Sequence, residues 1–227
     1  MKEINDLYDY NYKIVQNSDY FKFSLDSMLL AEFVNVNLSD KKLLDFCTGN
    51  APIPIMLSKN IENIVAFEIQ KEIYELADES LKINNIKNVE LYNEDIKNIG
   101  KYYKDGYFDI ITCNPPYFKV NETSKLNFNN VKAIARHEIF IKLEDIIFSA
   151  YKYLRDKGKF YIVYRPDRMI ELLNLFVKYK FGIKKIQCCY NNYKSNSSMI
   201  LIEAMKNGED DIKILPPLFT ENYRREK

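Results

Sequence analysis

The sequence predicts an α/β protein with a mostly parallel β-sheet and helices on both faces of that sheet. Short apolar runs alternate with segments of helical periodicity through the middle of the chain, and such alternation is typical of this class. Two further apolar runs near the end of the chain have the form of a hairpin. The length of 227 residues suits a single domain, 1–227, and 47% hydrophobic residues are enough for a sizeable core.

Five apolar runs are predicted to be the strands of the parallel part of the sheet. They occupy residues 41–47, 63–69, 88–95, 107–113 and 159–165. The fourth run ends at Asn114, Pro115, Pro116 and Tyr117, and the two prolines prevent it from continuing as a central strand.

Helices are predicted between these strands. A first helix is expected over about 52–59, beyond a turn that contains Gly49. The segment 71–85 is a predicted helix because its apolar residues recur at near-helical spacing. The segment 142–158 reads as an amphipathic helix that Gly158 closes.

The last third of the chain ends the sheet. Pro166 is expected to open a helix over 166–180. The apolar runs 182–190 and 197–206 then form the predicted terminal hairpin. Open sheets of this kind bind ligands beyond the carboxyl ends of their strands, so chemically suggestive residues are sought at those ends.

The composition argues against metal and membrane sites. None of the four cysteines (Cys47, Cys113, Cys188 and Cys189) has metal-ligand spacing, and His137 is the only histidine, so no metal is expected. No apolar run approaches the roughly 20 residues that span a bilayer, and the amino terminus is polar. A cytoplasmic protein is therefore expected.

The net charge of +1 indicates no polyanion partner for the molecule as a whole. The segment 178–194 nevertheless contains five lysines and no acidic residue. Such a stripe could follow a phosphate backbone. Because the chain is rich in lysine throughout, a solvated face is the favoured interpretation of this stripe on its own.

The first strand ends in the residues D-F-C-T-G-N, 45–50. Gly49 permits a positive φ and a close backbone approach. Cys47 stands where a dinucleotide-binding turn often has glycine, and no Walker lysine follows. Taken alone, the turn is as compatible with a structural role as with ligand binding.

Acidic residues follow the second and third strands. Glu68 could accept hydrogen bonds from both hydroxyls of a ribose, although an exposed cap of the strand is the alternative. Asp95 could accept a bond from an adenine amine, or it could cap the following helix. Ile69 and Ile96 could then hold an adenine ring between them.

The most specific pattern is N-P-P-Y at 114–117. The side-chain carbonyl of Asn114 and the backbone carbonyl of Pro115 are adjacent acceptors, held by the restricted φ angles of Pro115 and Pro116. Two such acceptors match an amino group with two hydrogens. Tyr117 offers a flat face on which a planar group can stack. A simple proline turn would explain the prolines but not the Asn and the Tyr.

These four strand ends resemble the class I S-adenosyl-L-methionine-dependent methyltransferases of the Asn-Pro-Pro-Tyr branch. The resemblance implies a seven-stranded, mostly parallel Rossmann-like sheet with an antiparallel C-terminal strand. It also implies that the first turn holds the methionine part of the cofactor, the second acid its ribose and the third its adenine. The Asn-Pro-Pro-Tyr loop would hold the substrate nitrogen, so Asn114, Pro115, Pro116 and Tyr117 are the implied catalytic residues.

A closer resemblance covers nearly the whole chain. Residues 14–33, A-R-H-E (135–138), Y-R-P-D-R (164–168), L-I-E-A-M-K-N-G (201–208) and K-I-L-P-P-L (213–218) are similar to the bacterial tRNA (adenine-N6)-methyltransferases. That family modifies adenine 37 in the anticodon loop of a valine tRNA. The turn departs from the family, because Cys47 and Ala51 replace glycines.

The resemblance implies the remaining site residues. The segment 1–40 is expected to cover the cofactor. The implied cofactor residues are Asp45, Cys47, Gly49, Asn50, Glu68, Ile69, Asp95, Ile96, Ser24 and Asp26. A substrate-side insertion is expected over 117–142. The implied tRNA-binding residues are Lys119, Lys132, Arg136, His137, Lys184 and Lys185, with a structural role as the alternative for His137.

Two alternatives remain open at this point. Glutamine methyltransferases that act on release factors share the Asn-Pro-Pro-Tyr loop, because a side-chain amide also presents an NH2 group. They usually add an N-terminal helical domain, for which the forty residues before the first strand leave no room. A catalytically silent RNA-binding module is the second alternative, supported only by Cys47 and Ala51. A monomer is expected.

Overall fold

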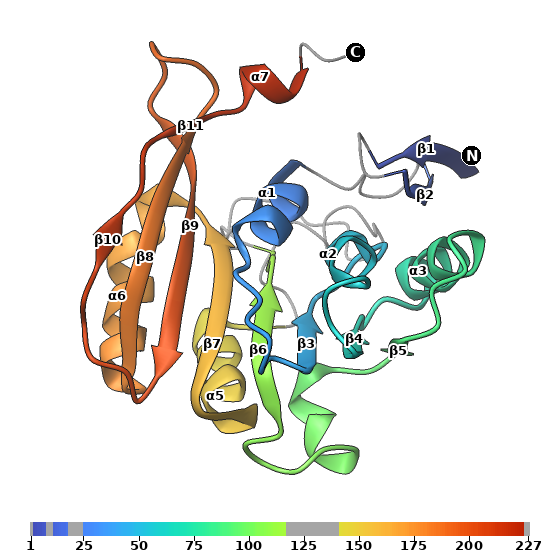
Figure 1. Cartoon of the computed structure of the whole chain (residues 1–227), viewed down its shortest axis with the longest axis horizontal. Coiled ribbons are helices and arrows are strands. Elements are labelled where there is room, and N and C mark those ends of the chain that lie inside the picture. Colours follow the sequence, from blue (N-terminus) through green and yellow to red (C-terminus); the bar gives the residue numbers. More distant parts are fainter. Residues whose placement is uncertain (1, 8–10, 18–24, 117–140, 225–227) are drawn as a thin grey trace, which may run out of the picture.

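The computed structural model describes residues 2–7, 11–17, 25–116 and 141–224. Within these residues a central sheet carries helices on both faces, with a small N-terminal ribbon beside it (Figure 1). The predicted fold class is confirmed.

Seven strands form the body of the sheet, in the order β5–β4–β3–β6–β7–β9–β8. Their bounds are β3 (Lys42–Phe46), β4 (Asn63–Phe67), β5 (Val89–Tyr92), β6 (Phe108–Cys113), β7 (Leu154–Tyr164), β8 (Phe181–Tyr190) and β9 (Ser197–Lys206). Strand β9 is antiparallel to both of its neighbours, and the other pairs are parallel. The short strands β10 (Lys213–Ile214) and β11 (Leu218–Phe219) extend the edge at β8.

Two hydrophobic clusters fix the layers. Alternate residues of a strand point to opposite faces, so Leu43 packs on one side of β3 while Leu44 and Phe46 pack on the other. The first side is covered by α1 (Leu25–Phe33), α2 (Pro52–Leu57) and α3 (Lys71–Ile83). The second is covered by η2 (Ile96–Lys101), α5 (Leu143–Tyr153) and α6 (Met169–Lys178). Burial on both faces explains the continuous apolar runs of the sequence.

The N-terminal ribbon consists of β1 (Lys2–Asp6) and β2 (Lys13–Asn17), which pair antiparallel. It rests on α3, because the backbone N–H of Val15 donates to Oγ of Ser80 over 2.9 Å. The side chain of Asn50 donates to the carbonyl of Val15 over 2.7 Å and joins the ribbon to the turn after β3. The start of the chain therefore lies next to that turn.

One predicted helix is too long. The sequence predicts a helix over 142–158, but α5 ends at Tyr153 and β7 begins at Leu154. Leu154 is fully buried and pairs with Phe108, so packing on β6 overrides the helical pattern of the residues that follow. A second difference is smaller: the segment after Pro166 starts as the 3-10 turn η3 (Pro166–Arg168) before α6 begins.

Candidate active site

The carboxyl ends of β3 and β6 lie side by side at the point where the strand order reverses. After β3 the chain builds β4 and β5 on one side, and it then returns to build β6 and β7 on the other. Ligands of open α/β sheets bind in the crevice at such a point. The predicted residues Asp45 and Asn114 come from these two strands, and Glu68 follows the neighbouring β4.

Asp45 is fully buried near the carboxyl end of β3. Thr112 pairs with Asp45 in the neighbouring strand β6, and its hydroxyl group donates a hydrogen bond to Oδ1 of Asp45 over 2.6 Å. Burial raises the pKa of Asp45 to about 7, against the hydrogen bond of Thr112, which lowers it. Thr48 lies close enough to lower that pKa as well, yet Oδ2 of Asp45 and Oγ1 of Thr48 have no hydrogen-bond partner of standard geometry within the described residues.

The turn after Asp45 has a left-handed backbone at three alternate positions. The φ angles are +54° at Cys47, +59° at Gly49 and +67° at Ala51. Cys47 and Ala51 therefore have the left-handed backbone that favours glycine, although neither of them is glycine. A Cβ atom built on Gly49 would meet no heavy atom within 4 Å, so open space lies beside this residue.

Glu68 holds this turn from the neighbouring strand. Its Oε2 accepts a hydrogen bond from the backbone N–H of Gly49 over 3.0 Å, and Oε1 accepts one from Gln70 over 2.9 Å. Only 5% of the residue is exposed, and burial raises the pKa of its carboxyl group. A carboxylate oxygen has two lone pairs, so both oxygens can still accept from a ligand. Oε1 of Gln70 is buried and has no partner within the described part of the chain.

The predicted adenine side of the site contains both exposed and buried groups. Ile69 is 42% exposed, whereas Ile96 is 4% exposed and belongs to the core. Asp95 caps η2, because its Oδ1 accepts from the N–H of Lys97 over 2.9 Å. Of the two roles considered for Asp95, the structure therefore shows the helix cap. Asn93 donates to the carbonyls of Glu68 and Ile69 and joins β5 to β4.

Asn114 lies at the end of β6 and is half-buried. Its Nδ2 donates a hydrogen bond to Oγ of Ser27 on α1 over 2.8 Å. Pro115 is buried and Pro116 is half-buried. The contact with Ser27 engages one hydrogen of the Asn114 amide and fixes its orientation, while no described residue bonds to Oδ1.

Several predicted residues have positions that bear on their roles. Asn50 is 3% exposed and its amide bonds to the N-terminal ribbon, which is a structural contact. Asp26 lies in the first turn of α1 and is half-buried. Other predicted residues lie outside the described part of the chain: Ser24, Tyr117, Lys119, Lys132, Arg136 and His137.

The predicted basic stripe over 178–194 is largely neutralised within the chain. Lys184 pairs with Asp211 over 2.6 Å, and Lys185 pairs with the buried Glu203 over 2.7 Å. Lys178 pairs with Glu144 over 2.5 Å. These contacts favour a structural role for the three lysines, and a tRNA contact of Lys184 or Lys185 stays a prediction.

Comparison with known proteins identifies the family. The family model for the methyltransferase small domain matches residues 21–194. The chain belongs to the methyltransferase small domain family. It is similar to a release factor glutamine methyltransferase of Thermodesulfovibrio yellowstonii, at 31% identity over 81% of this chain and 69% of the relative. It is also similar to a tRNA1(Val) (adenine(37)-N6)-methyltransferase of Flavobacterium psychrophilum, at 23% identity over 93% of both chains.

Further relatives of this methyltransferase have the same two names. Among solved structures, TYW2 of M. jannaschii in complex with AdoMet shares its fold, with a TM-score of 0.60 and 15% identity over 90% of this chain and 85% of that one. The chain is an S-adenosyl-L-methionine-dependent methyltransferase, and the resemblance to class I enzymes is confirmed.

The described residues fit this cofactor. The buried, unpartnered oxygens of Asp45, Thr48 and Gln70 lie around the turn, and open space lies beside Gly49. Such groups lose free energy unless a ligand or water bonds to them. A cofactor with amino and hydroxyl groups would supply those bonds.

Sequence reasoning missed several residues of this site: Ser27, Thr48, Gln70, Asn93 and Thr112. Ser27 contacts Asn114 across 87 residues of sequence, so only the fold reveals it. Thr112 could have been found, because it precedes the loop by two residues in a predicted strand beside Asp45. Neither a helix long and apolar enough to cross a membrane nor a cluster of metal-binding side chains occurs within the described residues.

Proposed function

We propose that this methyltransferase transfers a methyl group to the N6 nitrogen of an adenine in tRNA, in the anticodon loop. The observation that supports this substrate most directly is the end-to-end similarity to the tRNA1(Val) (adenine(37)-N6)-methyltransferase of F. psychrophilum, which covers 93% of both chains. Adenine 37 of a valine tRNA is accordingly the proposed nucleotide.

The proposed cofactor site is the crevice above β3 and β4. Asp45 and Gly49 would contact the methionine part, Glu68 and Gln70 the ribose, and Asp95 the adenine. Ile69 is exposed enough to pack on the adenine ring of the cofactor. Ile96 and Cys47 are proposed to pack beneath the residues that contact the cofactor. Ser24 and Asp26, with the segment 1–40, are proposed to cover its methionine end. When bound, S-adenosyl-L-methionine supplies a methyl group on a positively charged sulfur, which makes that group an electrophile.

The proposed catalytic residues act on the substrate nitrogen. The N6 lone pair of adenine is delocalised into the ring, so the nitrogen is a weak nucleophile. Oδ1 of Asn114 and the carbonyl of Pro115 would accept its two hydrogens and stabilise the positive charge that grows on it during transfer. Pro116 fixes the turn, and Tyr117 would stack on the base for roughly 1–3 kcal/mol.

The geometry of Asn114 supports this assignment. Its Nδ2 donates to Ser27 over 2.8 Å, and no residue in the described part of the chain bonds to its Oδ1. An amine donor needs an acceptor at this point, and a rotated amide would present a second donor. No side-chain general base is required in this scheme, because the two carbonyl oxygens stabilise the charge on nitrogen during transfer and the surplus proton on nitrogen then leaves to water.

A release factor glutamine is the second candidate substrate. A glutamine amide offers the same NH2 group, and the relative of T. yellowstonii has the higher identity, at 31%. The match covers 69% of that relative, whereas it covers 93% of the tRNA-modifying relative. The broader match supports the tRNA substrate.

The experiment is to incubate the full-length protein with methyl-labelled S-adenosyl-L-methionine and, in parallel, with unfractionated bacterial tRNA or with bacterial release factors. The expected result is label in tRNA, with N6-methyladenosine mapped to the anticodon loop by mass spectrometry. The Asn114→Ala variant is the matched control and should transfer no label. Label in the release factors alone would contradict the proposal and favour the second candidate.

A further inference from the structure

The hairpin of β8 and β9 continues beyond the end of the neighbouring strand. Strand β7 ends at Tyr164, which pairs with Ile200, whereas β9 starts at Ser197 and there pairs only with β8. Residues 189–199 therefore form an arm that rises from the edge of the sheet (Figure 1). β8 is parallel to β6 in the sheet, so this arm rises at the same edge as Asn114.

The turn at the tip of the arm is held in one conformation by its own hydrogen bonds. Backbone N–H groups of Asn192 and Lys194 bond to the side chains of Ser195 and Asn192, over 3.1 and 2.9 Å. The N–H of Ser195 bonds to the carbonyl of Asn192 over 3.1 Å. The C-terminal strand β11 buttresses the arm, because the N–H of Thr220 bonds to the carbonyl of Tyr190 over 2.8 Å. A turn ordered in this way loses little entropy when it binds a partner.

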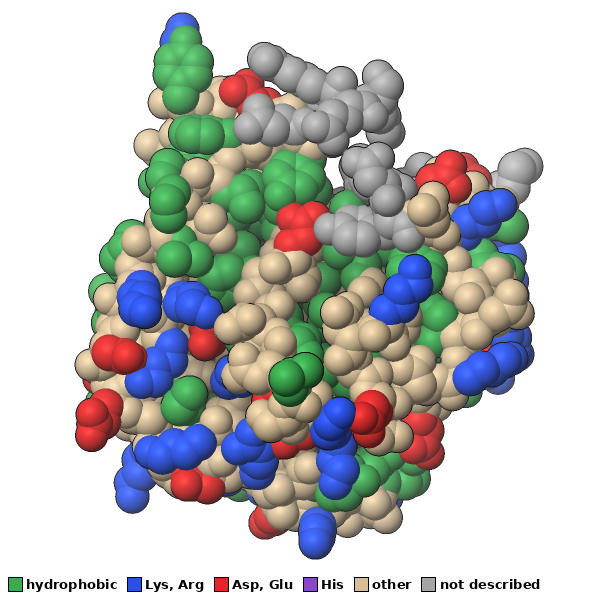
Figure 2. Space-filling model, viewed as in Figure 1, with side chains coloured by type: hydrophobic (Ala, Val, Ile, Leu, Met, Phe, Trp, Pro, Cys, Tyr) green, Lys and Arg blue, Asp and Glu red, His purple; other side chains and the backbone are tan. Residues whose placement is uncertain are grey.

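This ordered turn presents an aromatic ring and a cation to solvent. Tyr193 is 75% exposed, and Nζ of Lys194 lies 5.4 Å from the centre of its ring. No acidic residue occurs in the sequence from 178 to 202. In Figure 2 hydrophobic side chains run up the arm to its tip, and a basic side chain ends it. Both side chains are therefore available to a partner.

The tip lies too far from Asn114 to touch the target base. The register Cys113–Ile162–Ile202–Ile186 places Asn114 level with Gln187, three strands away. Strand spacing of about 4.8 Å and a rise of about 3.3 Å per residue put Tyr193 on the order of 20 Å from Asn114. At that distance the tip can reach nucleotides other than the one that is methylated.

We propose that the tip of the arm is an RNA-binding surface for nucleotides outside the target base, with Tyr193 stacking on a base and Lys194 contacting a phosphate. This inference rests on the proposed tRNA substrate. Stacking on an exposed aromatic ring and charge neutralisation by lysine are the two terms that bind single-stranded nucleic acid without sequence preference. A contact remote from the reacting atoms adds to affinity and leaves the chemical step unchanged.

The test compares Tyr193→Ala, Tyr193→Phe and Lys194→Ala with the wild-type protein, with unfractionated tRNA as the probe. Tyr193→Ala should raise the KM for tRNA at least about five-fold and leave kcat unchanged, whereas Tyr193→Phe should retain most of the affinity. Lys194→Ala should weaken binding and make the slope of log K against log salt shallower by roughly 0.7–0.9. Both side chains are exposed, so these variants are expected to fold.

Lys87→Ala is the matched control. This exposed lysine precedes β5, which lies at the other end of the strand order from β8 and β9. It should change neither KM nor the salt slope. Wild-type transfer to tRNA with unchanged KM in Tyr193→Ala and Lys194→Ala would overturn the assignment of the arm alone. Absence of wild-type transfer to tRNA, or transfer to a release factor instead, would overturn the proposed function and the arm with it.

Discussion

The side-chain amide of Asn114 is tied to the hydroxyl group of Ser27 by a 2.8 Å hydrogen bond. Ser27 is 7% exposed and lies in the first turn of α1, whose other contacts are in the core. The bond therefore fixes the orientation of an amide in the proposed catalytic loop from a rigid helix. Positioning of a reacting group by a partner with locked geometry is a general requirement of catalysis.

Replacing Ser27 with Ala should lower kcat by roughly five-fold without changing the affinity for S-adenosyl-L-methionine. Loss of one hydrogen bond of about 1 kcal/mol lets the amide of Asn114 rotate, so that its oxygen faces the substrate only part of the time. The measurements are steady-state methyl transfer and calorimetric titration of the cofactor.

Ser27→Thr is the matched control, because it retains the hydroxyl group. It should restore most of the lost kcat. A loss of activity that follows a fall in melting temperature equally in both variants would instead show that Ser27 acts only through folding.

Asn114→Ala should reduce kcat at least about 100-fold, because one of the two acceptors of the substrate amine is lost. The affinity for the cofactor should change little, since the amide is proposed to contact the substrate and not the cofactor. Equilibrium binding of the cofactor measures the second quantity. An equal loss of cofactor binding would show that the loop belongs to the other half of the site.

Asp45 should make stability dependent on pH. Its pKa is raised from 3.8 to about 7 in the folded protein, chiefly by burial. Between these values the native state holds a proton that the unfolded chain has released, so the contribution of Asp45 to stability falls as pH rises from about 4 to 7. Asp45→Asn should remove this dependence and still accept the bond from Thr112.

Denaturant unfolding of both proteins at pH 5 and pH 8 tests this expectation. The stability of Asp45→Asn relative to wild type should increase by about 2.7 kcal/mol from pH 5 to pH 8, because only the native state holds the proton between pH 5 and about pH 7, a range of two pH units. A difference that is the same at both pH values would mean that Asp45 titrates normally.

The sequence was informative where local chemistry and sheet topology agree. Apolar runs that end in Asp45, Glu68 and Asn114 predicted the mostly parallel sheet and the edge at which these residues gather, because parallel strands have their carboxyl ends at one edge. The terminal hairpin was also predicted correctly, since its two runs are separated by a short polar turn.

The remaining features depend on contacts between distant parts of the chain. Ser27 approaches Asn114 only after α1 packs against β7 and α2, and no local pattern marks it. The end of α5 at Tyr153 depends on the pairing of Leu154 with Phe108. Lys185 looked like a free cation in the sequence, yet Glu203 faces it across the hairpin. Tertiary contacts override local preference in each of these cases.

The left-handed backbone at Ala51 predicts an unusual response to glycine. A non-glycine residue in this region costs about 1–2 kcal/mol, and glycine would relieve that cost. Ala77 is also fully buried but lies within α3. Ala51→Gly should therefore destabilise the protein less than Ala77→Gly, by about 1–2 kcal/mol in the free energy of unfolding. Equal losses in the two variants would show that the turn relaxes around Ala51.

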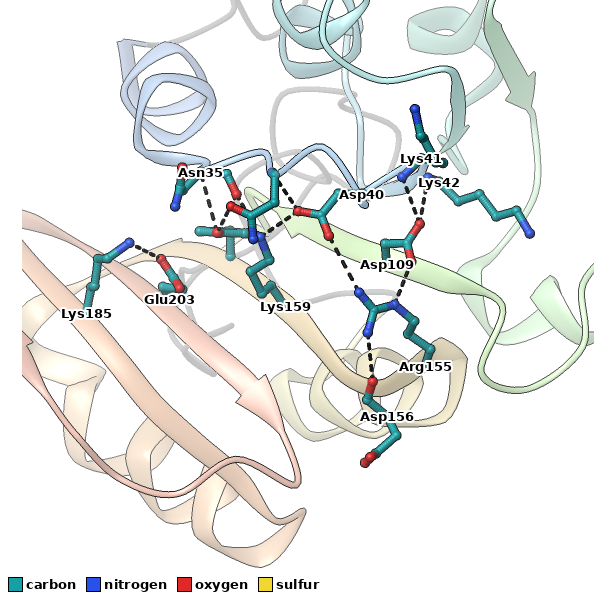
Figure 3. A network of polar contacts seen from close by, with 12 residues as sticks. Asn35, Asp40, Lys41, Lys42, Asp109, Arg155, Asp156, Lys159, Lys185 and Glu203 are labelled. Carbon is teal, nitrogen blue, oxygen red and sulfur yellow. Dashed lines mark hydrogen bonds and ion pairs between the residues drawn. The ribbon is translucent and has the colours of Figure 1, made fainter.

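A buried ion pair joins Lys159 of β7 to Asp40, which precedes β3. Nζ of Lys159 at the start of the regular part of β7 lies 2.6 Å from Oδ2 of Asp40, and it also donates to the carbonyl of Asn35 over 2.9 Å (Figure 3). Nearby, Arg155 donates to Asp109, which accepts the backbone N–H groups of Lys41 and Lys42. This network holds the connection between α1 and β3, and with it the helix that carries Ser27.

Lys159→Met should lower the free energy of unfolding by about 3 kcal/mol, because removing this partner of a buried pair leaves Asp40 with only the more distant Arg155, 3.6 Å away, to compensate its charge. The side chains of Lys159 and Asp40 are only 7% and 1% exposed. Lys178→Met is the matched control, since Lys178 pairs with Glu144 at the surface, with 59% and 46% of the side chains exposed, and its loss should be barely measurable. Urea unfolding of both variants decides the matter: similar small losses would mean that water reaches Asp40 and replaces its partner.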